Sequence, residues 1–564
     1  MTPFRNHMTA LCLSLFCLHT AAGQDTAVKN YPTLKQSIIA INLLKRHKNI
    51  TVSKLATTGL GHPVQLITVS TGQANLKPAI LILGNVTGKD HAATQITIGM
   101  VEQLAEKSKL LKNTTFYLIP IPSPDAVLGF ETQPFHAGDT NHRPFDDDKD
   151  FQLDEDGPED LNGDGWITQM RIKDVHGKYL KHKDDGRIMV LADAKNGQVG
   201  THRVLIEGID NDKDGLFNED GVGGTAFNKN HTFNYGFFEP GAGPHQVSEP
   251  ETRAIVEFAY KHTHIYAVYS FSEQDNLNSR WISGGNGRIP TQVEILDARY
   301  FSRFSKAYKS IFKGRGASTY HSQKGSFSRW AYFHYGRWSL TAPSFSVNLK
   351  ANLHKSKTNK TKTLSTKVKK NIKPTPKISG NADVNRLRYL ERQGLAGFVP
   401  WQKIKHPDFP GQVVEVGGFK PFVLSLPNFS KIPRLTQQNI KFIEKVAGSR
   451  AKLIFLKPKI EPLGQHVYRI TVTVRNVGNL PTVSTMGKRT KRLQVLQLKV
   501  IPPVGTQFIR GKKITRLGQI NPLGQEKRVY TLSLDAKASP VISFKVWSPC
   551  VGQKTLILHL IDSQ

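Results

Sequence analysis

Two spacings of apolar residues alternate along the first half of the chain. Residues 79–83 and 116–121 are apolar runs, which are typical of central strands covered on both faces. Residues 93–104 instead place apolar side chains at helical spacing, and 249–260 repeats that pattern. Alternation of buried strands with amphipathic helices predicts an α/β fold with a sheet between helices.

Two stretches interrupt this pattern. Residues 146–164 hold ten carboxylates and one lysine, and residues 350–377 hold ten lysines and no acidic residue. The lysine-rich stretch cannot form a core and predicts a solvated linker. After Val413 the pattern changes to short alternating strands between glycine, proline and asparagine turns, which predicts a C-terminal all-β sandwich.

These changes of pattern divide the chain into predicted domains. They are an α/β domain at 24–348 with an acidic insertion at about 137–222, a lysine-rich linker or insertion at 349–395, the completion of the α/β domain at 396–450, and a β-sandwich at 451–564.

The first 23 residues have the pattern of a secretory signal peptide. Arg5 precedes an apolar run at 8–18, and small residues lie ahead of Gln24. The run is shorter than the roughly 20 residues that span a bilayer, and no later stretch is long enough. We therefore expect a secreted, periplasmic or cell-envelope protein without an integral membrane segment after cleavage. Cys550 would be its single cysteine, which excludes an intramolecular disulfide.

The positive charge lies mostly in the C-terminal part of the chain. The whole sequence has 77 basic and 44 acidic residues, a net charge of +33, and residues 350–564 account for +31 of it. Export makes nucleic acid an unexpected partner. The charge instead predicts binding to an anionic surface polymer, and it supports the hypothesis of a basic envelope or adhesive protein.

The acidic insertion contains two near copies of one loop, at 146–157 and 210–221, with oxygen side chains at positions 1, 3, 5 and 9. A third, incomplete loop lies at 160–165. This spacing lets a tight loop wrap a calcium ion, and Gly215 at position 6 allows the turn. The candidate ligands are Asp146, Asp148, Asp150, Asp154, Asp210, Asp212, Asp214, Asn218, Asp160, Asn162 and Asp164. The alternatives are a solvated acidic loop paired with lysine and arginine, or general acid–base use of a carboxylate pair.

Short motifs lie at predicted strand ends and in loops between residues 66 and 422. They are Gly84-Asn-Val-Thr-Gly-Lys-Asp90, Pro122-Ser-Pro-Asp125, Asn228-Lys-Asn230, Ser248-Glu-Pro-Glu251, Gly325-Ser-Phe327 with Trp330, and the segment from His406-Pro407 to Gly417-Gly418. Together they resemble the carboxypeptidase A-like zinc metallopeptidase family, in particular a secreted bacterial subgroup with an acidic insertion. The resemblance implies a carboxypeptidase-like mixed twisted sheet flanked by helices, a peptide cleft and a catalytic zinc ion.

The positions that match the family's metal ligands carry other residues. The resemblance implies histidine, glutamate and a later histidine as zinc ligands, where this sequence has Thr87, Asp90 and Ser272. The position of the general-base glutamate corresponds to Pro343. A catalytic zinc needs three nitrogen or carboxylate donors and an open water position, so we expect this site to hold no zinc.

The resemblance also implies residues of a substrate cleft. Lys229 replaces an arginine that clamps a substrate carboxylate, Asn228 precedes it, and Tyr320 matches a family tyrosine. We therefore predict an inactive pseudo-peptidase that binds a peptide, a protein or another ligand in the retained cleft and is stabilised by calcium loops. The alternative is an active zinc metallocarboxypeptidase whose metal site has moved to His91, His231 and His264.

Overall fold

The computed structural model describes most of the chain. The described residues are 30–132, 134–135, 138–144, 151, 153–154, 156–218, 223–284, 287, 289–313, 315, 324–349, 381–421, 423–493, 495–535 and 539–560. The predicted signal peptide, Asp146, Asp148, Asp150, Tyr320 and most of the lysine-rich segment lie outside them.

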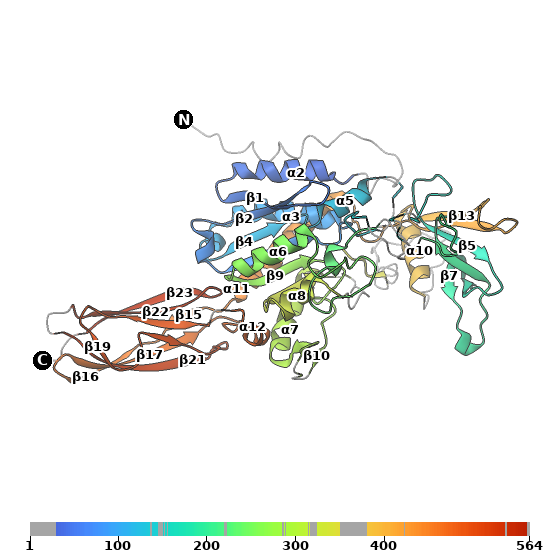
Figure 1. The fold of residues 1–564 in the computed structure, drawn as a ribbon. Coiled ribbons are helices and arrows are strands. Elements are labelled where there is room, and N and C mark those ends of the chain that lie inside the picture. The colour runs from blue at the N-terminus through green and yellow to red at the C-terminus, as the bar shows by residue number, and fades with distance from the viewer. Residues whose placement is uncertain are drawn as a thin grey trace, which may run out of the picture.

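A six-stranded mixed sheet forms the centre of the molecule, in the order β1-β2-β4-β3-β9-β12 (Figure 1). The strands are β1 (Ile50–Thr57), β2 (Pro63–Val69), β3 (Ala79–Asn85), β4 (Thr115–Ile119), β9 (Ile265–Phe271) and β12 (Trp338–Ala342). Strands β4, β3, β9 and β12 are parallel, and every residue of these four strands is buried. The apolar runs therefore form central parallel strands, which confirms the predicted α/β class.

Helices cover this sheet, and one hydrophobic core joins sheet and helices. The helices are α2 (Leu34–Leu43), α3 (His91–Ala105), α4 (Ser108–Leu111), α5 (Pro124–Glu131), α6 (Pro250–Lys261), α7 (Ile295–Ile311), α8 (Phe327–Phe333) and α11 (Ile432–Ser449). Helix α11 packs against α3 and α7, while α8 contacts β9 and β12. The last helix of the α/β body is thus far from the others in sequence and adjacent in space.

A second six-stranded sheet, in the order β13-β14-β5-β8-β6-β7, lies beyond the α/β body. It combines β5 (Gln169–Lys173), β6 (Tyr179–His182), β7 (Asp185–Leu191) and β8 (His202–Ile206) with β13 (Phe398–Ile404) and β14 (Val414–Phe419). The acidic insertion is therefore largely a sheet. Residues 396–450 were predicted to complete the α/β domain, but their first half completes this second sheet because Val414 and Val416 pack on Met170 and Ile172.

The end of the segment predicted as a linker is also ordered. Helix α10 (Ala382–Gln393) is capped by the Asn381 side chain and ends at Gly394. Its buried Val384 and Leu387 pack on Ile188 of β7. Apolar residues at helical spacing therefore make residues 382–393 part of the fold despite the lysines before them.

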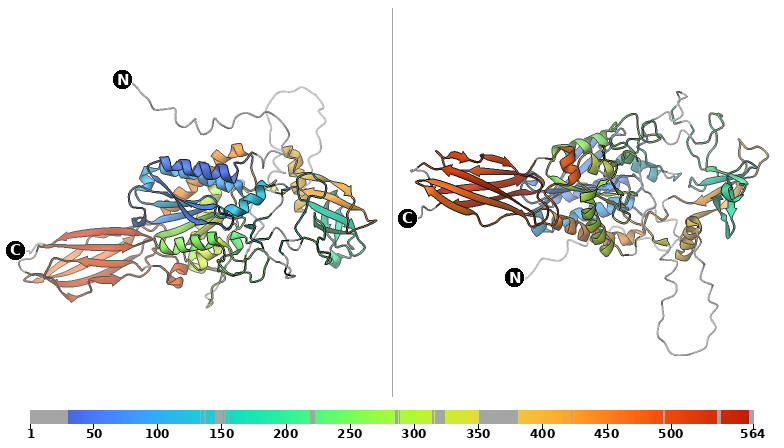
Figure 2. Two further views of the ribbon diagram at one scale, coloured as in Figure 1. Left: turned by 45° about the horizontal axis from the view of Figure 1, so that its top comes forward. Right: turned by 90° about the horizontal axis from the view of Figure 1, so that it is seen from below.

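The C-terminal region is a sandwich of two sheets, as predicted. One contains β15 (Leu453–Phe455), β16 (Lys459–Gly464), β17 (Val467–Asn476), β19 (Gln507–Arg510) and β21 (Gln525–Ser533); the other contains β18 (Gln497–Ile501), β20 (Ile514–Arg516), β22 (Val541–Ser548) and β23 (Gly552–His559). Their inner faces share a separate apolar core. The sandwich and the second sheet lie at opposite ends of the α/β body (Figures 1 and 2).

Short 3-10 helices and small elements connect these parts. They are η1 (Leu44–Arg46), η2 (Ala74–Leu76), η3 (Ala194–Asn196), η4 (Phe227–Lys229), η6 (Phe429–Lys431), β10 (Ser283–Gly284), β11 (Val293–Glu294) and α12 (Thr485–Thr490). Within the described residues, no helix combines the length and hydropathy required to cross a bilayer.

Candidate functional site

Four of the positions singled out in the sequence follow neighbouring parallel strands. Thr87 and Asp90 come after β3, Ser272 comes directly after β9, and Pro343 comes directly after β12. These strands are adjacent and parallel, so their carboxyl ends meet at one edge of the sheet. The backbone N–H of Ser272 donates to the carbonyl of Ala342 at 3.1 Å, which joins two of the strand ends.

Asp90 is held in place by hydrogen bonds from the chain. Its Oδ1 accepts from the Ser344 hydroxyl at 2.6 Å and from the Ala93 N–H at 2.9 Å, which makes it the N-cap of α3. Burial raises the pKa of Asp90, although these hydrogen bonds act in the opposite direction. The carboxylate at the family's glutamate position therefore begins a helix and binds a serine.

Ser272 has a similar set of partners. Its Oγ accepts from the Asn228 side-chain amide at 3.3 Å and from the Gln274 N–H at 3.2 Å, and Asn228 in turn accepts from the Phe327 N–H at 3.1 Å. Thr87 is buried beside this edge. Two neutral hydroxyls and one engaged carboxylate are not the donor set of a catalytic zinc, so the residues present do not fit that ion.

The general-base position carries no titratable group. Pro343 offers only its carbonyl, which accepts from the Arg315 guanidinium at 3.1 Å. Arg315 also donates to the Ser344 carbonyl at 2.8 Å and to the Tyr308 hydroxyl at 2.6 Å. The site therefore contains an arginine that binds backbone carbonyls of the strand end where the family has a glutamate.

The three histidines of the alternative metal site do not form a ligand group among the described residues. His91 stacks on Phe130 with ring centres 3.8 Å apart, and His264 is hydrogen-bonded to the Tyr117 hydroxyl at 2.9 Å. His231 is enclosed by aromatic rings, including Phe227. Burial lowers the pKa of His91 and His231 to about 3 and that of His264 to about 4. All three are neutral core side chains.

A cavity of about 840 Å³ lies between Lys229 and the second sheet. The Lys229 ammonium donates to the Pro240 carbonyl at 3.1 Å at the rim of this cavity. On the opposite wall, the Arg386 guanidinium lies 4.1 Å from the ring centre of Phe419, and its Nε is buried without an acceptor among the described residues. Trp401 and Tyr179 add aromatic surface. The cavity thus combines a cationic group of the α/β body with cationic and aromatic groups of the second sheet and helix α10.

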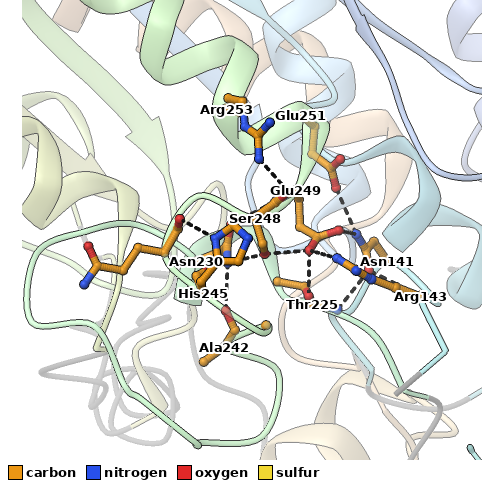
Figure 3. Close-up of polar contacts among 12 residues, drawn as sticks. Asn141, Arg143, Thr225, Asn230, Ala242, His245, Ser248, Glu249, Glu251 and Arg253 are labelled. Atoms are coloured by element: carbon orange, nitrogen blue, oxygen red, sulfur yellow. Dashed lines mark hydrogen bonds and ion pairs between the residues drawn. The ribbon is translucent and has the colours of Figure 1, made fainter. Parts of the chain in front are cut away.

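A buried polar cluster fixes the two ends of the insertion to α6 (Figure 3). Asn141, near the start of the insertion, donates to Glu249 at 2.8 Å and to Glu251 at 3.2 Å, and it accepts from the N–H of Thr225, just after the insertion, at 2.8 Å. Arg143 pairs with Glu249 at 3.1 Å. Helix α6 begins at Pro250 with no side-chain cap, since Glu249 and the preceding serine bind each other instead.

The two glutamates of this cluster differ in their ionisation. Burial tends to raise the pKa of Glu249, but hydrogen bonds from Ser248 and Asn141 and the charge of Arg143 hold it below its ordinary value. Burial raises the pKa of Glu251 to about 7, and its Oε2 has no donor among the described residues. The cluster therefore holds one carboxylate as an anion and favours the other as a neutral acid.

The acidic loops at 160–165 and 210–215 share one backbone geometry. In each loop the first aspartate accepts from the N–H of the sixth residue, Gly165 at 2.7 Å and Gly215 at 3.0 Å. Gly215 has a φ of +93°, which a glycine adopts without strain. The fifth residues, Asp164 and Asp214, each accept from the N–H two positions later. These bonds turn the side chains of each loop toward its centre.

One group of carboxylates in these loops has the arrangement of a cation site. Asp210, Asp212 and Asp214 each offer an oxygen, and these oxygens lie within 4.8 Å of one another. Asp210 is 9% exposed, and its Oδ1 has no donor among the described residues; the same holds for Oδ1 of Asn218. Asp154, another predicted ligand, is not part of this group, and its side chain lies beside Gly223. In the third loop, Asn162 and Asp164 hydrogen-bond to each other at 3.2 Å.

Several contributing residues had no signal in the sequence. Ser344 and Arg315 act through backbone and hydroxyl contacts that no spacing predicts. Asp156 accepts from the N–H of Asn211 at 3.1 Å and of Asn218 at 2.7 Å, and Asp408, distant in sequence, accepts from the N–H of Asp210 at 3.0 Å. The His406-Pro407 motif next to Asp408 was the one hint of this contact.

Comparison with known families finds two matches, one in the first part of the α/β body and one in the C-terminal sandwich. Residues 39–141 match the zinc carboxypeptidase family, and residues 452–558 match a family described as a domain of unknown function (DUF8731). The first match includes Thr87 and Asp90, and it confirms the resemblance to the carboxypeptidase A-like zinc metallopeptidases. No curated protein sequence matches the chain.

Similar solved structures are carboxypeptidases and a related inhibitor of fibrinolysis. Bovine thrombin-activatable fibrinolysis inhibitor, in complex with tick carboxypeptidase inhibitor, is 12% identical with a TM-score of 0.37, covering 74% of this chain and 97% of that chain. Carboxypeptidase A from Helicoverpa armigera is 12% identical with a TM-score of 0.34, covering 57% and 67%. Metallo-carboxypeptidase from Burkholderia cenocepacia is 12% identical with a TM-score of 0.30, covering 56% and 60%.

Proposed function

We propose that this chain is an exported, carboxypeptidase-like protein that binds a peptide and does not hydrolyse it. The observation that carries the proposal is the set of residues at the ends of β3, β9 and β12. Thr87 and Ser272 are neutral hydroxyls, and the one carboxylate, Asp90, is occupied by Ser344 and the first turn of α3. Hydrolysis by this family needs a metal-bound water and a base, and neither is supported by these groups.

The cavity beside Lys229 is the proposed binding site. Lys229 follows Asn228, the residue that hydrogen-bonds Ser272, so the cavity adjoins the former catalytic edge. Lys229 keeps a positive charge for a carboxylate, and Arg386 offers a second cation whose Nε has no acceptor within the described part of the chain. Aromatic rings beside the cations suit the side chains of a peptide. A peptide with a free C-terminal carboxylate fits this chemistry.

Calcium is the proposed cofactor, in a structural role. Its support is the convergence of Asp210, Asp212 and Asp214 together with the buried, unpaired Oδ1 of Asp210. Three carboxylates this close repel one another unless a cation neutralises them, and oxygen ligands from a tight loop are what calcium prefers. The ion would stiffen the loop at 210–215, which follows strand β8 of the second sheet. This sheet forms one wall of the cavity.

Metal content and hydrolysis test the loss of catalysis. The purified protein is analysed for bound metals and is incubated with peptides that have free C-terminal carboxylates, with and without a zinc chelator. We expect bound calcium, no stoichiometric zinc and no release of C-terminal residues. Stoichiometric zinc together with chelator-sensitive hydrolysis would overturn the proposal and would favour the active zinc metallocarboxypeptidase.

Binding is tested separately by calorimetry with a peptide and with the same peptide amidated at its C-terminus. We expect the free carboxylate to bind more tightly, and both Lys229→Ala and Arg386→Ala to weaken binding roughly tenfold, the loss of one charged contact. Lys195→Ala removes an exposed lysine outside the cavity and is the matched control. Equal affinity for the two peptides, or equal loss in the control, would contradict binding at this cavity.

A further inference from the structure

The four-stranded sheet of the C-terminal sandwich has an outer face with an unusual set of side chains. It is formed by β20, β18, β22 and β23, and the inward residues Leu498, Phe544 and Val546 of its two central strands are fully buried. The alternate residues point outward. We call the outward side chains of these four strands the basic face; they include Arg516, Gln497, Lys499, Lys545, Trp547 and Gln553.

Strand register brings like charges together on the basic face. Lys499 lies directly opposite Lys545 across the β18–β22 pair, and Arg516 lies opposite Gln497 across β18–β20. Two like charges at directly opposed positions destabilise a sheet. No carboxylate within the described residues forms an ion pair with Lys499, Lys545 or Arg516. The fold therefore maintains a repulsive arrangement that an anionic partner would relieve.

The outer face of the other sheet differs. There Glu461 of β16 pairs with Lys459 and, at 3.3 Å, with Arg469 of β17. A further ion pair of this sheet, Glu526 with Arg528 at 2.7 Å, lies on the inner side, since Glu526 is opposite Val474 and Arg528 is opposite Val472. Residues 451–564 contain 19 lysines and arginines and four acidic residues. The acids that form these ion pairs lie on one sheet. The outward positions of β20, β18, β22 and β23 instead combine Lys499, Lys545 and Arg516 with neutral residues, among them the exposed Ile501, Ile514 and Ile557.

The neutral residues of the basic face indicate the kind of partner. Trp547 and Gln497 are opposite each other, and Gln553 is opposite Trp547 on the next strand. With neighbouring strands about 4.8 Å apart, the row from Arg516 to Gln553 is about 15 Å long. Its amides can donate to and accept from hydroxyl groups, while the half-buried indole ring can pack on the apolar side of a sugar ring.

We infer that the basic face of the sandwich binds an anionic polysaccharide, one that carries carboxylate or sulfate groups along its chain. Lysine and arginine attract its charges, and the glutamines and Trp547 contact its sugar rings. This inference is independent of the proposed peptide binding, since it concerns the other end of the molecule (Figure 2).

The α/β body leaves the basic face accessible. The sandwich contacts that body from one end: α12 packs against α7 and α8, and the Cys550 thiol, in the turn after β22, donates to the Thr263 carbonyl at 3.1 Å. Lys499 and Arg516 are exposed. A polymer can therefore lie across the four strands while the cavity at the opposite end remains open.

Binding of the full-length protein to dextran sulfate, polygalacturonate and uncharged dextran tests the inference, at low and high salt. We expect binding to the two charged polymers, loss of that binding at high salt, and no binding to dextran. The triple variant Lys499→Gln, Lys545→Gln, Arg516→Gln should bind roughly tenfold more weakly, because it removes three charges that attract the polymer. Trp547→Ala should weaken binding with little change in its salt dependence, because it removes ring packing and leaves the charges.

The matched control removes three charges from the outer face of the other sheet: Lys459→Gln, Arg469→Gln, Lys527→Gln. It should bind as the parent protein does, within about twofold, since the overall charge is the same as in the triple variant. Equal loss in the control would show a response to net charge alone and would overturn the inference. So would absence of binding to both charged polymers, or binding to phosphatidylglycerol vesicles without binding to either polymer.

Discussion

Two groups of carboxylates in this molecule differ in the hydrogen-bond donors that surround their oxygens. In the α/β body, Asp90 and Glu249 accept hydrogen bonds from serines, an amide and the backbone, and Glu251 has a pKa near 7 and can hold a proton. In the insertion, Asp210, Asp212 and Asp214 converge on one another, and Oδ1 of Asp210 has no donor among the described residues. In the first group Oε2 of Glu251 also lacks a donor among the described residues, and the raised pKa of that acid favours its neutral form; in the second group the convergence of three carboxylates supports the proposed calcium ion.

The family resemblance and the candidate metal site therefore lie in different regions: the resemblance includes the edge of the central sheet, and the candidate metal site lies in the insertion. At the edge of the central sheet the motif positions that resemble the family lie together, but Asp90 and Ser272 are hydrogen-bonded within the chain. The loop at 210–214 instead brings three carboxylates together, and Oδ1 of Asp210 has no donor among the described residues. A carboxylate at a position that matches a family motif is therefore weaker evidence for a metal than several carboxylates whose oxygens converge.

The largest expected effect concerns Glu251. Its pKa is raised to about 7 in the folded protein, so between about pH 4.5 and 7 the folded state holds a proton that the unfolded state releases. The free energy of unfolding therefore falls as the pH rises through this range. Glu251→Gln imitates the protonated acid and should remove this slope, leaving the variant more stable than the parent by roughly 3 kcal/mol above pH 7 and equal to it at acidic pH.

Urea unfolding at about pH 5 and about pH 8 measures this effect as the difference between the two midpoints. Glu257→Gln, on the exposed side of the same helix, is the control and should leave the parent's pH dependence intact. If Glu251→Gln retains the full pH dependence, Glu251 ionises normally and the two groups of carboxylates are not distinguished by protonation.

The next effect concerns calcium. Saturating calcium should raise the free energy of unfolding of the insertion by about 2 to 3 kcal/mol, the value for a ligand at about 100 times its dissociation constant. Asp210→Asn should abolish this increase, because it removes charge from the carboxylate whose Oδ1 is unpaired. Thermal unfolding with calcium and with a chelator measures it. Asp185→Asn, which alters a carboxylate already bound by Arg187 at 2.7 Å, should leave the calcium response unchanged.

Much of the fold was predictable from the sequence because buried strands and helices place apolar residues at regular spacings. The run at 79–83 and most of the run at 116–121 became fully buried strands, and the late alternating segments became the sandwich. The second sheet was missed because it pairs strands that are distant in the sequence: β5 and β14 are more than 200 residues apart. Near Met170 and Val416 the acidic and lysine-rich stretches dominate the composition, and a pairing between distant short strands has no local signature.

The candidate site was predictable in its positions and not in its contacts. The motifs located Thr87, Asp90, Ser272 and Pro343 at strand ends. They could not indicate that Ser344 would bind Asp90 or that Arg315 would bind the end of β12, because these contacts depend on tertiary packing. The raised pKa of Glu251 has the same origin, since it results from burial at the root of the insertion.

A smaller effect is expected at the edge of the central sheet. Ser344→Ala removes the 2.6 Å hydrogen bond to Asp90 and should lower the free energy of unfolding by about 1 to 2 kcal/mol. It should not create a zinc site, because Thr87 and Ser272 remain as hydroxyls. Unfolding and metal analysis of the variant measure the two outcomes. Stoichiometric zinc in Ser344→Ala would mean that Ser344 alone prevents metal binding at this edge.

The smallest effect is expected for the ion pair nearest to Asp90. Lys89 and Glu273 lie 3.7 Å apart, and the Glu273 side chain is 49% exposed, so water screens their attraction. Glu273→Gln should change the free energy of unfolding by less than about 0.5 kcal/mol. Glu273 is the one exposed carboxylate directly after β9, next to Ser272, and so the one that could still reach a metal from this edge. Under the proposed function, Glu273→Gln leaves the metal content of the protein unchanged. A loss of bound metal in this variant would instead place a cation at the edge of the central sheet. The carboxylates of this edge and those of the insertion would then no longer differ in metal binding.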